Sequence, residues 1–364
     1  MNKKLLLGMC LSVWMGVTYA EEITIDPIDL IAAGETQNVN INLINESTDI
    51  GAIQFSLHLP AGVTIVEDQY GFVYDYYDRL KYGRNNYFEV TIDDWGNGEY
   101  FFLIHSGTSG SGISGTSGTP ILYITVQASD QISTTGNVAK VTGQVFADAN
   151  SSNAYYHEDT TFDNVTLRVA AKIGSSGYCS FSWPRNLDFT GCENFTNVFY
   201  GKSETETSVV VSSIDDFIVP AGTGVIVKGT AGQTVYPNTT DQTSDVSSIF
   251  TATSSAPVTV TTKGEAYALA VINGTTGFYP CNAGVTIPQY KCYLPGSVAA
   301  KSFIAIHQET NNEQVVSDDA GIVDGINNVN SDVTNDAYYD VQGRRITTPR
   351  HGVYIQNGKK VIIK

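Results

Sequence analysis

The first half of the chain alternates hydrophobic and polar residues with a period of two. Val39, Ile41 and Leu43 alternate with Asn40 and Asn42. Since successive side chains of a strand point to opposite faces, this pattern predicts a strand with one buried face. Ile53, Phe55, Leu57 and Leu59 repeat it against Gln54, Ser56 and His58. Similar segments bring the predicted strands to about nine, the others being residues 23–26, 63–66, 88–92, 100–104, 121–126, 138–145 and 165–169.

The remainder of the chain is also built from short segments rich in Val, Ile, Thr, Tyr and Phe, and it has no long helical pattern. Its 34 glycines favour tight turns. Asn273-Gly274 and Asn357-Gly358 predict two-residue hairpin turns, and Pro220-Ala221-Gly222 predicts a turn between apolar strands. The sequence therefore predicts an all-β protein with two β-sandwich domains and a short C-terminal hairpin.

The N-terminus has the three regions of a secretory signal peptide. Lys3 and Lys4 precede the apolar run LLLGMCLSVWMG, and the small-residue site predicts cleavage after Ala20. Export to the cell surface or medium, with the periplasm in transit, is the expected route. The predicted organisation comprises the signal (1–20), a first domain (21–170), a second β-rich domain of unknown function (171–309), a linker (310–335) and a C-terminal segment (336–364).

The chain is acidic, with a formal net charge of −17, and removal of Lys3 and Lys4 makes the mature form more acidic still. Residues 21–170 hold 20 acidic against 5 basic residues. This charge repels phosphate backbones, so nucleic acid is not an expected partner. High charge also supplies solubility without any ligand.

An aromatic segment, YGFVYDYYDRLKYGRNNYF, follows the first strands. Flat aromatic rings stack on sugar rings and also anchor protein interfaces. The predicted ligand-binding residues are Tyr74, Tyr76, Tyr77, Tyr82 and Arg84, together with Trp95 in the turn DDWGNG. The alternative is that these tyrosines fill the sandwich core or cover one of its edges.

The sequence shows no catalytic motif and no metal-binding motif. The adjacent pairs Asp93-Asp94 and Asp215-Asp216 are typical of solvated turns, whereas glycoside hydrolysis needs carboxylates delivered across a cleft. The five histidines are scattered singly. Oxygen ligands in residues 146–164 raise calcium as a candidate, but their spacing is not that of an EF-hand and a polar connection is the simpler interpretation. We therefore expect a protein that is not an enzyme and has no cofactor.

All four cysteines beyond the signal lie in the second domain. An even number in an exported chain favours disulfides. Proximity in sequence suggests Cys179 with Cys192 and Cys281 with Cys292. Four buried thiols or a zinc site are the alternatives, although zinc usually takes more closely spaced pairs.

Residues 23–170 resemble the jelly roll of cohesin and carbohydrate-binding modules. The resemblance is carried by AGETQNVNINL, GAIQFSLHLPAGVTIV and SGTPILYITVQA, which are core and turn segments. It implies a non-catalytic fold that holds a partner protein such as a dockerin, or a polysaccharide. It assigns no binding residue.

Two later segments resemble parts of type IX secretion substrates. VPAGTGVIVKG, AYALAVINGTTGFYP and IPQYKCYLPG resemble a β-rich module of such proteins, which carries no known activity. YDVQGRR and the terminal GVYIQNGKKVIIK resemble their C-terminal sorting signal, which implies contact with the secretion machinery.

Two functional hypotheses follow. In the first, an exported protein binds a polysaccharide or a surface protein through its cohesin-like domain. In the second, both sandwiches are spacers in a structural or adhesive surface component. The sequence indicates no oligomeric state.

Overall fold

The computed structural model describes residues 21–45, 49–77, 80, 88–107, 112–113, 116–150, 152–205, 207–296 and 301–309, and the strands of residues 338–363. The chain divides into two compact units, Met1–Val169 and Ala170–Lys364. Every regular element in the described parts is a strand, so the predicted all-β class is confirmed. No helix long and apolar enough to span a membrane occurs among the described residues.

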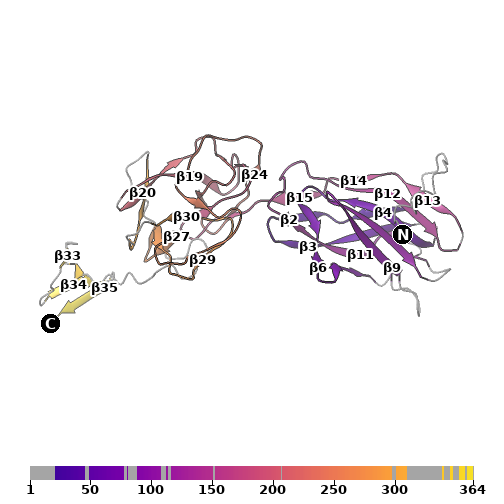
Figure 1. The fold of residues 1–364 in the computed structure, drawn as a ribbon, viewed down its shortest axis with the longest axis horizontal. Coiled ribbons are helices and arrows are strands. Elements are labelled where there is room, and N and C mark those ends of the chain that lie inside the picture. The colour runs from indigo at the N-terminus through magenta and orange to yellow at the C-terminus, as the bar shows by residue number, and fades with distance from the viewer. Residues whose placement is uncertain are drawn as a thin grey trace. The chain divides into compact units, whose positions relative to one another are not determined.

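The first unit is a sandwich of two main sheets (Figure 1). In the five-stranded sheet, β1 (Glu22–Ile25), β3 (Thr36–Asn45) and β11 (Thr116–Ala128) lie in that order, and both β5 (Val63–Ile65) and β8 (Tyr74–Tyr76) pair with β11. The six-stranded sheet has the order β13 (Ala154–His157), β12 (Ala139–Asp148), β4 (Ile50–His58), β10 (Glu99–Ser106) and β9 (Phe88–Gly96), with β14 (Thr160–Phe162) also on β12. Two small pairs complete the unit, β2 (Ile28–Ile31) with β15 (Val165–Arg168) and β6 (Glu67–Asp68) with β7 (Gly71–Phe72).

The core of the first unit follows the alternation in the sequence. Val39, Ile41 and Leu43 on β3 are buried, as are Phe55 and Leu57 on β4. Each of the nine predicted segments forms a strand. Residues 146–164, predicted as a polar connection, instead contain the short strands β13 and β14, whose three or four residues are too few to show a period.

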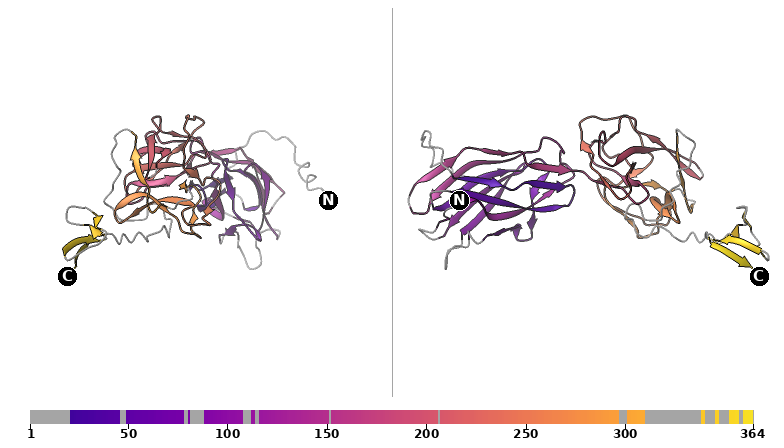
Figure 2. Two further views of the ribbon diagram at one scale, coloured as in Figure 1. Left: turned by 60° about the vertical axis from the view of Figure 1, so that its left-hand side comes forward. Right: turned by 180° about the vertical axis from the view of Figure 1, so that it is seen from behind.

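The second unit consists of several smaller sheets (Figure 2). The largest has the order β17 (Tyr178–Phe181), β22 (Val225–Gly229), β19 (Phe195–Glu204), β20 (Ser208–Ser213) and β31 (Ala305–Gln308). A second has the order β25 (Thr251–Ala252), β30 (Cys292–Pro295), β27 (Ala266–Ile272) and β28 (Thr275–Pro280). The others are β21 (Ile218–Val219) with β18 (Leu187–Asp188) and β24 (Asn238–Thr239), β16 (Ala171–Lys172) with β23 (Thr234–Val235), and β26 (Val258–Thr259) with β29 (Thr286–Ile287).

Strand β27 separates two hydrophobic clusters. Tyr267, Leu269 and Val271 belong to the larger one. Ala266 and Ala268 belong to a smaller one. Because successive side chains alternate across the strand, the sequence AYALAVI is buried on both faces.

The predicted turns of the second unit are present. Asn273 and Gly274 join β27 to β28, and their φ angles of 51° and 78° match a type I′ turn. In the turn between β21 and β22, the carbonyl of Pro220 accepts a hydrogen bond from the amide of Thr223 at 3.1 Å. Near the C-terminus, β34 (Gly352–Gln356) pairs with β35 (Lys359–Ile363), while Asn357-Gly358 lies outside the described residues. The short strands β32 (Tyr338–Tyr339) and β33 (Arg345–Ile346) extend this sheet.

Neither of the predicted disulfides is formed in the structure. Cys292 packs in the larger hydrophobic cluster and Cys281 in the smaller one. Cys179 is buried on β17 opposite Val227, and Cys192 lies half-buried in the loop after β18. Three of the four cysteines are thus buried and the fourth is partly exposed, and their pairing stays a prediction.

Candidate functional site

The predicted aromatic residues do not form one surface. Tyr74 and Tyr76 lie half-buried on β8, on the opposite side of the strand from the exposed Asp75. Their rings meet edge to face with centroids 5.7 Å apart. The Tyr74 hydroxyl donates a long hydrogen bond of 3.5 Å to the carbonyl of Val90 on β9, so it reaches from one sheet to the other. These two tyrosines therefore pack at an edge of the sandwich, and their role in ligand binding stays a prediction.

The environment of Tyr76 supports this structural role. Burial raises its pKa to about 12, and the hydrogen bond with Tyr74 and the charge of Asp75 act in the same direction. The hydroxyl consequently stays protonated and is held within the edge.

Tyr77 lies over the outer face of the five-stranded sheet. Its hydroxyl donates to Oδ1 of Asn40 at 2.6 Å, and its ring contacts Tyr123 with centroids 6.2 Å apart. Asn40 in turn donates to Asp26 at 2.6 Å. The tyrosine is thus part of a local polar network. Tyr82 and Arg84 lie outside the described residues.

Trp95 lies on the other sheet. Its ring stacks on Phe101, with centroids 4.9 Å apart and an interplanar angle of 3°. Tyr100 and Phe102 point into the core, so Phe101 between them points outward. Trp95 therefore lies on the outer face of the six-stranded sheet, where it is 51% exposed. Of the predicted residues that the structure describes, it alone lies on that face.

Apolar side chains extend across this outer face. Strand pairing places Tyr156 of β13 opposite Val145 of β12, and Val145 opposite Gln54 of β4. Gln54 lies opposite Leu103 of β10, which neighbours Phe101 on the same face. Tyr156 is 54% exposed. We define the docking face by these apolar residues, which are Trp95, Phe101, Leu103, Val145 and Tyr156.

Sequence reasoning missed most of the docking face, although β10 carried a signal. In EYFFLIHS, Tyr100, Phe102 and Ile104 are buried, yet Phe101 and Leu103 on the opposite side are apolar as well. A strand that is apolar on both faces is expected to be covered on both. Among the described residues, only the inner face of β10 is covered by the core. Its outer face is therefore a candidate interface.

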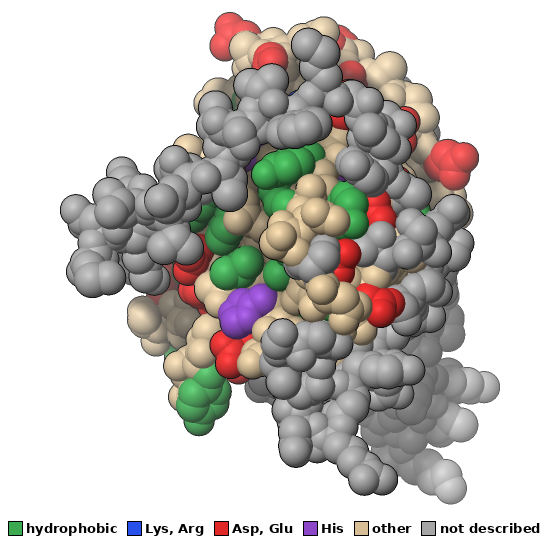
Figure 3. Space-filling view, turned by 90° about the vertical axis from the view of Figure 1, so that its right-hand side faces the viewer, with side chains coloured by type: hydrophobic (Ala, Val, Ile, Leu, Met, Phe, Trp, Pro, Cys, Tyr) green, Lys and Arg blue, Asp and Glu red, His purple; other side chains and the backbone are tan. Residues whose placement is uncertain are grey.

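Acidic side chains surround the docking face. Glu89 lies 3.6 Å from the ring of His105, and Glu99 lies 3.9 Å from the ring of His58. Asp93 lies opposite Phe101 on β9. Exposed Lys140, beside His58, is a basic residue on the same side. In Figure 3, which shows one end of the first unit, red acidic and green hydrophobic side chains adjoin among the described atoms.

Several of the acidic residues considered for catalysis or calcium accept hydrogen bonds from backbone amides. Asp94 accepts the amide of Gly96 at 2.6 Å, and Asp216 accepts that of Ile218 at 3.1 Å. In the segment raised for calcium, Asp148 accepts the amide of Asn150 and Asp159 accepts that of Gly143. No group of three or more residues with metal-ligating side chains occurs in the described part of the chain.

Comparison with known proteins gives structural neighbours for part of the chain. No family model and no curated protein matches the sequence. The chain is similar to the cohesin module of a family 33 glycoside hydrolase from Clostridium perfringens, with 14% identity, 42% of this chain and 99% of that chain covered, and a TM-score of 0.32. It is also similar to a type I cohesin–dockerin complex from Clostridium thermocellum (14% identity, 43% and 99% covered, TM-score 0.33). A third neighbour is the seventh ScaB type I cohesin from Pseudobacteroides cellulosolvens (17% identity, 42% and 96% covered, TM-score 0.31).

Each of these three neighbours is or contains a cohesin module. The resemblance of the later segments to type IX secretion substrates stays a prediction.

Proposed function

We propose that this chain is a non-catalytic binding protein that captures a partner protein through the docking face of its first unit. The observation that carries the proposal is the set of apolar side chains on the outer side of β13, β12, β10 and β9, of which Trp95 and Tyr156 are exposed and the others half-buried. Gln54 of β4 lies between Val145 and Leu103 in this row. Large contiguous apolar surfaces are uncommon on soluble proteins and mark interaction sites. Aromatic residues near the centre of such a surface usually carry most of the binding free energy.

The charges around the docking face indicate the chemistry of the partner. Glu89, Asp93 and Glu99 lie around an apolar centre, whereas Lys140 is the basic side chain beside them in the described part of the chain. A complementary surface presents aliphatic or aromatic side chains flanked by Lys and Arg. We therefore infer a partner whose interface has basic rather than acidic residues around its apolar centre.

The signal-like N-terminus supports export as part of the same proposal. Residues 1–20 would be removed after Ala20, and the terminal segment that begins near residue 336 would contact the secretion machinery. Intact-mass analysis of the protein from the cell surface tests this. Retention of residues 336–364, together with unchanged location after their deletion, would contradict the sorting role.

The test of docking uses the mature chain, residues 21–364, immobilised and exposed to the surface and secreted proteins of the source cells. The captured protein is then purified, and its Kd is measured for the wild type and for Trp95→Ala and Leu103→Asp. We expect each substitution to weaken binding at least tenfold, about the effect of losing an interface anchor. Tyr70→Ala is the matched control, because Tyr70 is 88% exposed in the turn between β6 and β7, outside the docking face.

Three outcomes decide between the hypotheses. Loss of binding with Trp95→Ala but not with Tyr70→Ala supports the docking face. Equal binding by all variants overturns it. Absence of any specific partner favours the alternative in which the sandwiches are spacers.

A further inference from the structure

Glu21 is the one acidic residue that is buried among the described residues, with 1% of its surface exposed. It immediately precedes β1, in which Ile23 and Ile25 are buried whereas Glu22 and Thr24 are half-buried. Because successive side chains alternate between the two faces of a strand, Glu21 continues the inner side of β1. An acidic side chain therefore lies where the alternation calls for an apolar one.

The carboxylate of Glu21 is not compensated. Its Oε2 is buried and has no hydrogen-bond partner among the described residues. The adjacent Glu22, by contrast, accepts a hydrogen bond from the hydroxyl of Thr160 at 3.2 Å. Burying an ionised carboxylate without a donor or an opposite charge is costly. The unpaired oxygen of Glu21 thus marks a place that a donor would stabilise.

Neighbouring side chains are engaged elsewhere. Strand pairing sets Ile44 opposite Glu22, so that Asn45 is the next residue along β3, and its side-chain amide donates to the carbonyl of Ile113 at 2.6 Å. In the described part of the first unit the basic residues are Lys140 and Arg168. Arg168 pairs with Asp29, and Lys140 lies on the outer side of the six-stranded sheet.

Cleavage after Ala20 creates a donor on Glu21 itself. Hydrolysis of the Ala20–Glu21 amide by water leaves a carboxylate on Ala20 and an α-ammonium group on Glu21. This group carries a positive charge and more N–H donors than the neutral amide of the uncleaved chain. Because the ammonium and the carboxylate belong to one residue, rotation of the Glu21 side chain alone suffices to bring them together.

We propose that removal of the signal peptide stabilises the first unit, because the new α-ammonium group of Glu21 pairs with the buried carboxylate of the same residue. The inference rests on the cleavage after Ala20 that is proposed above. The uncleaved chain is then less stable than the exported form, so that the sandwich reaches its full stability only after processing.

The test compares three forms of the mature chain by urea unfolding at pH 7. The first begins with Glu21, the second is preceded by Gly-Ser, and the third is acetylated at the α-amino group, which removes the charge without adding a residue. Intact mass establishes that the N-terminal glutamate of the first form has not cyclised. We expect the extension and the acetyl group each to lower the midpoint of the first unit's transition by about 0.5 M.

Two variants separate the pairing from other effects of the extension. Glu21→Leu replaces the buried carboxylate by an apolar side chain, and the extension should then leave the midpoint unchanged. Glu22→Leu is the matched control, because it makes the same change at the half-buried neighbour and should keep the full effect of the extension. The difference between the two variants measures the coupling between the ammonium and the Glu21 carboxylate.

Each outcome decides the proposal. A midpoint lowered by both modifications, with Glu22→Leu but not with Glu21→Leu, supports the pairing. Equal midpoints for the three forms overturn it, as does a shift that persists with Glu21→Leu. A different N-terminus on the exported protein would instead refute the cleavage after Ala20. The two failures are distinguishable, because the unfolding experiment uses chains whose first residue is defined.

Discussion

Trp95 stacks on Phe101 with ring centroids 4.9 Å apart and planes within 3° of parallel, on the outer face of a sheet whose inner face forms the core. The stack uses one face of the indole and leaves the other toward solvent. A partner that covers this indole would bury a large apolar area at little conformational cost, because Phe101 already holds the ring in place. This preorganisation is the structural reason to regard Trp95 as the anchor of the docking face.

The stack predicts a spectroscopic change on binding. In the mature chain, the tryptophans are the half-exposed Trp95 and the buried Trp183. Partner binding is expected to shift the emission to shorter wavelength and to lower its quenching by acrylamide, because Trp95 loses contact with water. Trp95→Phe serves as the control and should abolish both changes. Unchanged quenching in the wild type at saturating partner would show that Trp95 stays exposed in the complex.

Two adjacent residues of β10 should differ in their effect on stability. Phe102 is fully buried and stacks on Phe55 with centroids 4.7 Å apart, whereas Phe101 lies on the outer face. Phe102→Ala is expected to lower the free energy of unfolding by about 3–5 kcal/mol, the usual effect of deleting a buried aromatic ring. Phe101→Ala should lower it by about 1 kcal/mol or less. Both free energies are measured from the unfolding transition of the first unit in urea. Similar losses for the two variants would contradict the assigned faces.

A buried glutamine should be required for the stability of the first unit. Gln144 is 1% exposed, and its Oε1 accepts the amide of Ile23 at 2.8 Å. Its Nε2 donates to the carbonyl of Glu158 at 3.0 Å, so one side chain joins β1 and β12 to the chain before β14. Gln144→Ala would remove the acceptor of the Ile23 amide and one of the two partners of the Glu158 carbonyl, which His157 also contacts at 2.8 Å. A loss of about 1–3 kcal/mol is expected. Gln54→Ala, a half-buried glutamine on the outer face, is the control, and an equal loss there would contradict the structural role of Gln144.

The strands of the first unit were predictable because the period of two is strong where one face is buried. The docking face was harder to predict, because it depends on which residues of β9, β10, β12 and β13 lie opposite one another. That register is a property of tertiary pairing. The position of the tyrosine segment was hard to predict for a similar reason. Tyr74 and Tyr76 pack at the edge of the sandwich, whereas Trp95 lies on the docking face.

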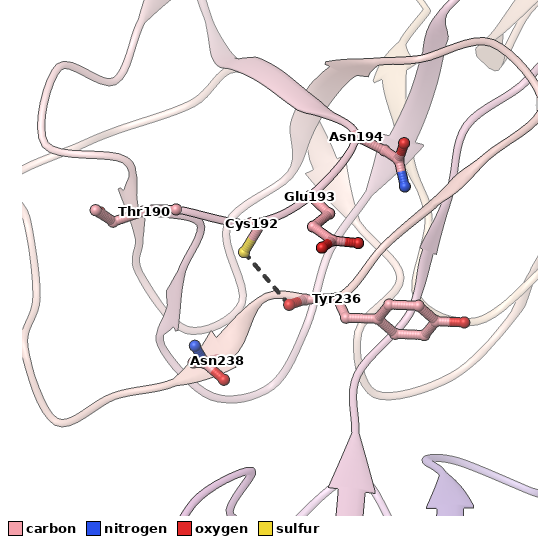
Figure 4. Close-up of a pocket in the computed structure, with 7 residues that line it drawn as sticks. Thr190, Cys192, Glu193, Asn194, Tyr236 and Asn238 are labelled. Carbon is pink, nitrogen blue, oxygen red and sulfur yellow. Dashed lines mark hydrogen bonds between the residues drawn. The ribbon is translucent and has the colours of Figure 1, made fainter.

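In the second unit, too, local features could be predicted from the sequence and tertiary contacts could not. The hairpin at Asn273-Gly274 was predictable because its turn chemistry is local. The contact between Cys192 and the Tyr236 carbonyl (Figure 4) was not predictable, because the two residues are 44 positions apart in the sequence and meet only in the folded unit. The sequence also did not indicate that Cys281 and Cys292, though close in sequence, pack in different clusters.

Alkylation of Cys192 should depend on pH in a way that reveals its environment. Burial raises the pKa of this thiol to about 11, with the charge of Asp188 acting in the same direction, so its reactive thiolate is scarcer at any pH below that value. At pH 8, iodoacetamide is expected to modify it about 100-fold more slowly than a thiol of pKa about 9, and the rate should still rise between pH 9 and 11. Mass spectrometry of peptides measures this rate in the folded mature chain, with the same chain in denaturant as the control. A rate that levels off below pH 9 would show that the thiol is not buried as the structure has it.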